Sequence, residues 1–486
     1  MARTSITHPL EIAGVAVGPG MGRIGITFCP GKKQTSAATG AWDRDLGLDV
    51  RAVEDWGAAA VVTLVEIHEM TDLGVAGLGQ EVRRRHMDWF HAPIRDVSVP
   101  DAAFEAVWEK IGEGLRDRLR AGFDVVVHCK GGLGRAGMIA ARLLVELGWA
   151  PLAAVVEVRR VRRGAIETSA QEGHVMACAA IPEHQPSTTP EAIQARAVGA
   201  LLGLAVGDAV GTTLEFKTRD SYPVLTDMIG GGPFGLKPGQ WTDDTAMALA
   251  LADSLIACSG LDEQDLLGRF ADWWGNGTYS CTGTCFDIGG TTAQALRRWE
   301  ATGADHSGST DPQSAGNGSL MRLAPVAIRY FGDRDTLRDA AARQSKTTHA
   351  APEAVDACVV YAEILADAIE GRKRSEVLAG RAGAWAGSIG PIVGGSWRGK
   401  ARPAINASGY VAHALEAALW SVGRAGPDFE RTVLLAANLG QDADTTAAIA
   451  GQLAGAFEGV AGIPSEWLAK LAWRERLARA AADLWN

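Results

Sequence analysis

The sequence predicts two domains of different fold class: an N-terminal α/β domain whose mostly parallel sheet is flanked by helices, and an almost wholly α-helical C-terminal domain. The chain of 486 residues is longer than one hydrophobic core usually serves. The segment at 181–193 holds three prolines among Ser, Thr and His, a composition that suits neither helix nor strand. The hydrophobic pattern also changes across this segment. We therefore expect domains at 1–182 and 191–486, joined by a linker at 183–190.

Two short runs before the linker, at 60–66 (AVVTLVE) and 123–128 (FDVVVH), are rich in β-branched residues and predict buried strands. Between them, apolar side chains recur at the spacing of one helix face. These side chains are Phe104, Val107, Trp108, Ile111, Leu115 and Leu119. The order strand, helix, strand is typical of an α/β domain with a parallel sheet.

After the linker, four long Ala/Leu-rich segments have helical length and composition, at 246–257, 351–371, 409–422 and 445–459. No run alternates convincingly between apolar and polar residues, as a half-buried strand would. The second domain is therefore predicted to be helical throughout.

Composition excludes several classes of protein. The formal net charge is −10, with most of the acidic excess in the second domain, so we expect no nucleic-acid partner. No apolar run reaches the length of a membrane span, and Pro9 and Glu11 interrupt the N-terminus, so neither a membrane nor a signal peptide is expected. The seven cysteines lack CxxC spacing, which favours free thiols and a cytoplasmic location.

The segment HCKGGLGRAG, at 128–137, predicts a phosphate site. Cys129 ends a predicted strand, a glycine-rich turn follows, and Arg135 precedes a helical run. Backbone N–H groups of such a turn, together with the helix dipole, bind an oxyanion and stabilise a cysteine thiolate. We expect Cys129 to act as nucleophile and Arg135 to hold phosphate oxygens. The predicted loop comprises Lys130, Gly131, Gly132, Leu133, Gly134 and Arg135.

Two acidic clusters, WTDDT at 241–245 and GQDADTT at 440–446, each lie just before a predicted helix. A single such Asp would be interpreted as a helix cap. Adjacent carboxylates repel unless a cation lies between them, and oxygen ligands without His or Cys favour Mg²⁺ or Mn²⁺. The two clusters could hold two ions, which suits activation of water.

The first motif resembles the signature of the protein tyrosine phosphatase superfamily, in particular the small dual-specificity phosphatases, over about residues 20–180. The resemblance implies that Asp96 is the general acid, with Asp101 as a competitor that also looks like a helix N-cap. It implies that Gln171 positions the hydrolytic water. The chain departs from the family at Ala136, where a hydroxyl usually assists departure of the thiolate, so we expect slow hydrolysis of the phosphocysteine.

From about residue 191, five sequence blocks resemble the ADP-ribosylglycohydrolase family. The resemblance implies a catalytic or metal-gating role for Glu215 in GLAVGDAVGTTLEF. It implies metal ligation by Thr242, Asp243, Asp244, Asp442, Asp444 and Thr445. It implies substrate contacts by Asp287, Asn317, Gly318, Ser319, Met321 and His349. For His349 a purely structural role is equally compatible with the sequence. Two positions depart from the family pattern: Gly290, where Asn is frequent, and Gln441, where Gly is common.

The sequence therefore predicts a bifunctional hydrolase. The second domain would remove ADP-ribose from a modified protein or small molecule with two Mg²⁺ or Mn²⁺ ions, and the first would hydrolyse phosphate monoesters of a protein or small molecule without a cofactor. Two alternatives stay open. One half could be a phosphate- or ADP-ribose-binding module without activity. Both sites could also act in sequence on one phosphorylated ribosyl metabolite.

Overall fold

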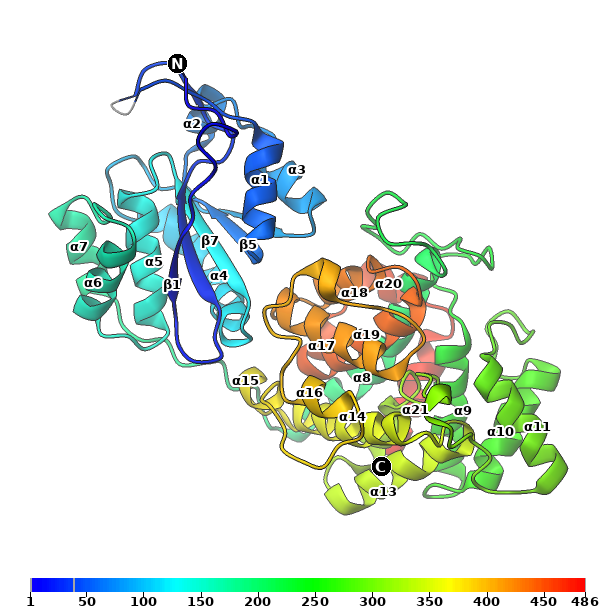
Figure 1. The fold of residues 1–486 in the computed structure, drawn as a ribbon. Helices are drawn as coiled ribbons and strands as arrows, with labels where there is room; N and C mark the ends of the chain where they lie inside the picture. The colour runs from blue at the N-terminus through cyan, green and yellow to red at the C-terminus, as the bar shows by residue number, and fades with distance from the viewer. Residues whose placement is uncertain (1, 38–39, 486) are drawn as a thin grey trace. The chain divides into compact units, whose positions relative to one another are not determined.

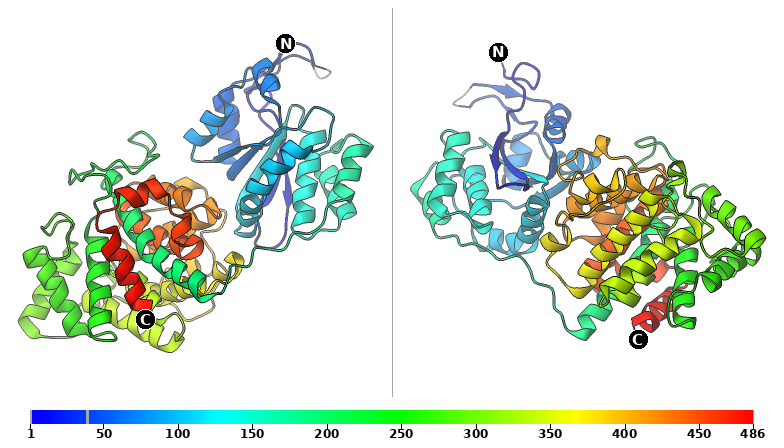
Figure 2. Two further views of the ribbon diagram at one scale, coloured as in Figure 1. Left: turned by 180° about the vertical axis from the view of Figure 1, so that it is seen from behind. Right: turned by 60° about the horizontal axis from the view of Figure 1, so that its bottom comes forward.

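The computed structural model describes residues 2–37 and 40–485 and divides the chain into two compact units, Met1–His184 and Gln185–Asn486. The division falls within the proline-bearing segment at 181–193. Figures 1 and 2 show the two units as a mixed α/β body and a helical body. Each unit is described separately below.

The first unit is built on a five-stranded sheet of order β1-β2-β7-β5-β6. Only β1 is antiparallel to its neighbour, whereas β2, β7, β5 and β6 all run parallel. The strands are β1 (Ala13–Ala16), β2 (Arg23–Phe28), β5 (Ala58–Thr63), β6 (Asp88–His91) and β7 (Asp124–Cys129), and a separate hairpin is formed by β3 (Lys33–Gln34) and β4 (Trp42–Asp43). The predicted strands at 60–66 and 123–128 correspond to β5 and β7, which confirms the α/β prediction.

Helices cover both faces of this sheet (Figure 1). One hydrophobic core joins the sheet to α4, α5, α6 and α7, and a second joins it to α1, α2 and α3. Their bounds are α1 (Leu46–Asp55), α2 (Ile67–Asp72), α3 (Leu78–Arg84), α4 (Ala102–Arg120), α5 (Gly134–Glu146), α6 (Pro151–Val161) and α7 (Ser169–Met176). The helix predicted from the apolar spacing is α4. Because β7 lies at the centre of the sheet, the loop that follows it is supported from both sides.

The second unit is helical, as predicted. Across residues 185–485, all of which are described, β-structure is limited to isolated bridges. The helices are α8 (Pro190–Gly211), α9 (Asp243–Ala257), α10 (Glu263–Asn276), α11 (Gly290–Thr302), α12 (Ala324–Tyr330), α13 (Arg334–Thr348), α14 (Pro352–Glu370), α15 (Arg374–Val377), α16 (Ile389–Val393), α17 (Val411–Ala425), α18 (Phe429–Ala437), α19 (Ala443–Gly462), α20 (Ser465–Lys470) and α21 (Arg474–Trp485). Short 3₁₀ turns lie at Thr212–Leu214 (η1), Pro312–Ser314 (η2) and Arg402–Ala404 (η3).

Helices α8 and α19 form the centre of this unit, and their backbones touch (Figure 1). Glycines recur at every fourth position of α8, at 199, 203, 207 and 211, and face α19. A Cβ atom on Gly203 would lie 2.2 Å from the carbonyl oxygen of Gly451, and one on Gly207 would lie 2.1 Å from that of Ala447. Only glycine permits such an approach. The contact brings the C-terminal end of α8 beside the N-terminal end of α19, where acidic residues gather.

One helical stretch, which contains α8, bears on the expectation that the chain does not enter a membrane. The helical stretch Pro190–Leu214 passes the test of length and composition for a span, with a mean hydropathy of 1.6. Alanine and glycine residues separate the larger apolar side chains of this stretch, so the stretch does not form a continuous run of large apolar residues. In the structure 89% of the 18-residue window with this mean hydropathy is buried inside the protein. The hydropathy of α8 therefore reflects its central position in the helical unit.

Candidate functional sites

The loop after β7 forms the first candidate site. Cys129 ends the strand with a 4% exposed side chain, and the backbone N–H of Gly132 donates to its Sγ at 3.2 Å. Gly132 has φ of +70°, and a Cβ there would lie 2.4 Å from the backbone of Thr27 and Phe28. No other residue fits this position without displacing β2. The turn therefore directs a backbone N–H group at the cysteine sulfur, as an anion site requires.

Arg135, in the first turn of α5, is buried and held by several acceptors. Its guanidinium donates two hydrogen bonds to Glu69, at 2.6 and 3.0 Å, and one to the carbonyl oxygen of Ile94 at 2.9 Å. Burial is the largest influence on Glu69 and raises its pKa, but the hydrogen bonds from Arg135 and from the backbone of Glu66, together with the nearby positive charges, outweigh it and lower the pKa of that carboxyl. The bidentate pair fixes the plane of the guanidinium. Glu69 was missed by the sequence reasoning because it lies 66 residues upstream on a short helix, in no recognisable motif.

The structure separates the two candidate general acids. Asp96 Oδ1 lies 2.8 Å from Nη2 of Arg135, with 54% of its side chain exposed. Asp101 instead accepts a hydrogen bond from the backbone N–H of Phe104 at 2.9 Å and caps α4. Asp96 is therefore the carboxylate at the loop, beside the residue that would bind phosphate, whereas Asp101 has the structural role that its position suggested.

Two further predicted residues lie against the same loop. Gln171 is fully buried, donates to the carbonyl oxygen of Ser98 at 3.3 Å and accepts from the N–H of Glu167 at 3.0 Å. A Cβ on Gly134 would lie 3.0 Å from both terminal atoms of the Gln171 amide. Ala136 is also fully buried, so the position that usually carries a hydroxyl presents a methyl group to packed surroundings.

His128, next to the cysteine, is buried and belongs to a hydrogen-bond chain with Thr63 and Trp89. Trp89 Nε1 donates to Thr63 Oγ1 at 2.8 Å, and that hydroxyl lies 2.7 Å from Nε2 of His128. Indole only donates, so Thr63 Oγ1 accepts the hydrogen bond from Trp89, whereas the direction of the bond between Thr63 and Nε2 follows the tautomer of the ring. Burial lowers the pKa of His128 to about 3. The imidazole next to Cys129 is therefore neutral.

The second candidate site gathers carboxylates from three helix ends. Asp243 and Asp244 begin α9, Asp442 and Asp444 lie at the start of α19, and Glu215 follows η1. One oxygen from each of Glu215, Asp442 and Asp444 lies within 4.8 Å of the others, and the same holds for a second set of Asp244, Asp444 and Asp208. The α8–α19 contact and the start of α9 thus bring together residues more than 200 positions apart in the chain.

The threonines of both motifs also face this cluster. Thr242 Oγ1 lies 3.3 Å and Thr445 Oγ1 lies 3.4 Å from the same oxygen, Oδ2 of Asp244. Asn317 donates to Asp442 at 2.7 Å. Glu215 Oε2 accepts from the N–H of Ala443 at 2.7 Å, in the first turn of α19. All six predicted ligands therefore come together, with Glu215 beside them.

The electrostatics of the cluster fit divalent cations. Burial, together with the charge of Asp444, raises the pKa of Glu215 to about 12, that of Asp287 to about 9 and that of Asp442 to about 7. Burial also raises the pKa values of Asp243 and Asp244 well above their usual range. Oδ1 of Asp244 is buried and has no hydrogen-bond partner among the described residues. An unpartnered carboxylate oxygen within an all-oxygen donor set suits Mg²⁺ or Mn²⁺.

A cavity of about 550 Å³ opens beside this cluster. Predicted residues that line it are Glu215, Asp243, Asp287, Asn317, Gly318, Met321, His349, Asp442 and Asp444. The hydroxyl of Ser319 instead lies 2.8 Å from that of Ser345 and faces the core. Gly290 lines the cavity and has open space at its Cβ position, so the missing Asn side chain leaves room for ligand or water. Gln441 has φ of +61°, which explains why glycine is common at this position.

His349 combines the two roles that the sequence left open. Its ring lines the cavity, yet it is 3% exposed and packs on the loop at 316–318, where a Cβ on Gly318 would lie 2.7 Å from it. Its Nδ1 is 2.8 Å from Thr348 Oγ1. Burial lowers the pKa of His349 to about 3, so the ring is neutral. The ring supports the glycine loop and lines the cavity, which is compatible with both roles.

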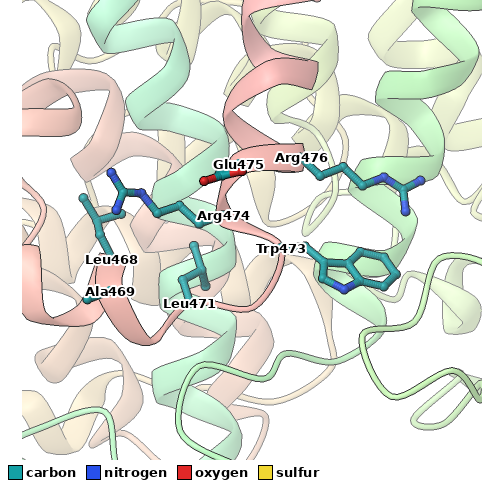
Figure 3. A pocket seen from close by; sticks show the side chains of 7 residues that line it. All are labelled: Leu468, Ala469, Leu471, Trp473, Arg474, Glu475 and Arg476. Carbon is teal, nitrogen blue, oxygen red and sulfur yellow. The ribbon is translucent and has the colours of Figure 1, made fainter.

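A cavity of about 510 Å³ at the start of α21 lacks comparable chemistry (Figure 3). Arg474 and Arg476 point away from each other there, and Arg476 pairs with Asp253 at 3.2 Å. The arginines do not converge on a common point, so this cavity is not a candidate active site.

Comparisons with known proteins match a different family in each unit. The family model described as ADP-ribosylglycohydrolase matches residues 189–486, and one described as the DSP-PTPase phosphatase of polymorphic toxin systems matches residues 45–149. The ADP-ribosylarginine hydrolase Tri1 of Pseudomonas putida is 46% identical over 61% of this chain and 80% of its own length. The ADP-ribosyl-[dinitrogen reductase] glycohydrolase of Rhodospirillum rubrum is 35% identical over 58% of this chain and 92% of its own length. A solved ADP-ribosylglycohydrolase-related protein complex matches 60% of this chain and 98% of its own at 40% identity, with a TM-score of 0.54.

Proposed function

The chain belongs to the ADP-ribosylglycohydrolase family through residues 189–486, and on that premise we propose that its second unit is a hydrolase that uses two divalent cations to release ADP-ribose from modified arginine. The observation that carries the proposal is the meeting of both acidic motifs and Glu215 beside one cavity. The choice of arginine rests on the name of the Pseudomonas putida relative. The modified arginine would belong to a protein or a small molecule.

The proposed reaction adds water across the bond between the ribose C1″ and a guanidine nitrogen. The water oxygen attaches to C1″, and the leaving nitrogen takes a proton. Cations bound by Thr242, Asp243, Asp244, Asp442, Asp444 and Thr445 would supply Lewis acidity toward the ribose hydroxyls and water. Glu215 would accept the proton of the water once bound cations offset the neighbouring carboxylates that raise its pKa, while the N–H of Ala443 holds its Oε2. Backbone groups of the loop at 316–318 suit a diphosphate, since glycine allows close approach.

We propose that the first unit hydrolyses phosphate monoesters through Cys129. The Sγ–P bond forms as the P–O bond to the leaving group breaks, and Asp96 protonates the leaving oxygen. Water then splits the phosphocysteine, releases phosphate and restores the thiolate, with Gln171 positioning that water. Arg135 would hold two phosphate oxygens through Nε and through the Nη2 donor that Asp96 occupies in this structure. This unit needs no cofactor, and its substrate would be a phosphorylated protein or small molecule.

All seven cysteines are free, which supports a reducing compartment, and we propose the cytoplasm as the place of action. The acidic charge of the chain supports partners other than nucleic acid.

A substrate panel tests the proposal for the second unit. ADP-ribosylarginine, ADP-ribosylserine and O-acetyl-ADP-ribose are each incubated with the full chain in Mn²⁺, Mg²⁺ or EDTA, and released ADP-ribose or ribose product is measured. We expect turnover of the arginine conjugate with Mn²⁺ or Mg²⁺ and none in EDTA. Binding of ADP-ribose without turnover of any conjugate would favour a binding module instead. Turnover limited to the serine conjugate would contradict the assignment of arginine.

A further inference from the structure

Asp208 is a buried carboxylate in the block GLAVGDAVGTTLEF, and neither the sequence analysis nor the proposed reaction assigns it a role. It lies on α8, one residue after Gly207, and is fully buried. The close contact of Gly207 with α19 places it next to both acidic motifs. One of its oxygens lies within 4.8 Å of oxygens of Asp244 and Asp444. Proximity alone would make Asp208 a further cation ligand, but its hydrogen bonds indicate another role.

Both oxygens of Asp208 are occupied by donors from the first turn of α9. Oδ1 accepts from the N–H and the hydroxyl of Thr242, each at 2.9 Å. Oδ2 accepts from the N–H and the hydroxyl of Thr245, at 3.0 and 2.6 Å, and also lies 3.1 Å from the N–H of Thr242. A carboxylate surrounded in this way has little capacity left for a cation.

These bonds replace the usual cap of α9. Thr242 occupies the N-cap position, where a threonine hydroxyl normally accepts from the N–H three residues later, but its side chain makes no such bond. Asp208 accepts from that N–H, on Thr245, in its place. The helix that carries Asp243 and Asp244 is therefore capped by a side chain from α8.

The same arrangement orients the Thr242 hydroxyl. Oγ1 of Thr242 is 2.9 Å from Asp208 but 3.3 Å from Asp244 Oδ2 and 3.4 Å from Asp444 Oδ2. A hydroxyl has one proton, and the shortest of these contacts takes it. The lone pairs of Thr242 then face two carboxylate oxygens, an arrangement that repels unless a cation lies among them.

We propose that Asp208 is a positioning residue that accepts the hydrogen bond of the Thr242 hydroxyl and caps α9. In this way Thr242, Asp243 and Asp244 present oxygen ligands to a cation that Asp208 itself does not contact. The inference rests on the proposed use of divalent cations by this unit. It predicts that Asp208 controls how tightly the cation binds without changing how many are bound. Removal of a direct ligand would instead reduce the number of cations bound.

Calorimetric titration of the full chain with Mn²⁺ alone tests this inference. Asp208→Asn should lower Mn²⁺ affinity roughly 10- to 100-fold, the usual loss on removing a residue that orients a ligand, with the number of ions bound unchanged. Asp244→Asn should reduce that number. Asp253→Asn, on the same helix but paired with Arg476, is the matched control and should bind as the wild type does. Thermal unfolding in EDTA checks that each variant is folded.

A double-mutant cycle tests whether Asp208 acts through Thr242. When Asp208→Asn is added to Thr242→Val, Mn²⁺ affinity should fall by less than about threefold beyond the loss caused by Thr242→Val alone. If Asp208→Asn does not fold, Thr242→Val and Thr242→Ser serve instead. Thr242→Val should lower Mn²⁺ affinity, whereas Thr242→Ser, which keeps the hydroxyl, should bind Mn²⁺ as the wild type does. Loss of a bound ion in Asp208→Asn, or wild-type affinity in Thr242→Val, would overturn the inference. Absence of Mn²⁺ binding by the wild type would instead refute the proposed cation use, and the inference with it.

Discussion

Among single residues, Ala136 has the most direct kinetic consequence. Position 136 is buried in the first turn of α5, directly after the loop that surrounds Cys129. A hydroxyl there would stabilise the sulfur as it leaves phosphorus, whereas the alanine methyl group cannot donate a hydrogen bond. The thiolate therefore leaves with less assistance, and the second chemical step should limit turnover.

Stopped-flow measurement with p-nitrophenyl phosphate should detect this limit. The wild type should release a burst of nitrophenol equal to the enzyme concentration before a slow steady state. Ala136→Ser should raise the steady-state rate roughly tenfold, equivalent to about 1.4 kcal/mol of barrier. Linear release without a burst in the wild type would show that hydrolysis of the phosphocysteine is not slow.

Glu69 should matter to the same site through Arg135. Its carboxylate makes two hydrogen bonds to a guanidinium that is 2% exposed, so Glu69→Gln leaves part of a buried ion pair unsatisfied. We expect kcat/KM for phosphate ester hydrolysis to fall at least tenfold, or about 1.4 kcal/mol. Glu157→Gln is the control, since Glu157 pairs with Arg160 at the exposed surface. Equal kcat/KM values for Glu69→Gln and the wild type would contradict this role.

At the scale of elements, the α8–α19 contact determines where the acidic motifs meet. Gly203→Ala should destabilise the second unit by about 1–3 kcal/mol, since its Cβ would lie 2.2 Å from a backbone oxygen that cannot move alone. Gly275→Ala, on α10 with open space at its Cβ position, should be neutral or stabilise by up to about 1 kcal/mol. Denaturant unfolding of both variants measures the difference. A Gly203→Ala variant as stable as the wild type would mean that the two backbones separate without cost.

The elements also show what the sequence could and could not predict. Apolar spacing identified α4, short β-branched runs identified β5 and β7, and length with Ala/Leu-rich composition identified the four long helices. These signals missed β1 and β6, which have four residues each, and β2, whose six residues RIGITF include Gly25 and lack a continuous β-branched run. The repeat of glycine at every fourth position of α8 was visible in the sequence, but its partner on α19 was not.

At the scale of the whole molecule, motifs located the residues with chemical roles, whereas the residues that hold them in place required the structure. Cys129, Arg135 and the six predicted ligands lie in compact segments whose residue types indicate their chemistry. Glu69 lies in no recognised motif. Asp208 lies within the block GLAVGDAVGTTLEF, but its contacts across helices are not visible in the sequence. The two sites lie in separate units, so each should lose activity without affecting the other.

One assay tests the central claim that the chain carries two independent hydrolytic sites. The wild type, Cys129→Ser and Asp444→Ala are each supplied with p-nitrophenyl phosphate and ADP-ribosylarginine in the same Mn²⁺ buffer. We predict that Cys129→Ser loses phosphate release and retains ADP-ribose release at the wild-type rate, and that Asp444→Ala shows the reverse. Loss of both activities in either variant, or retention of both, would contradict the claim.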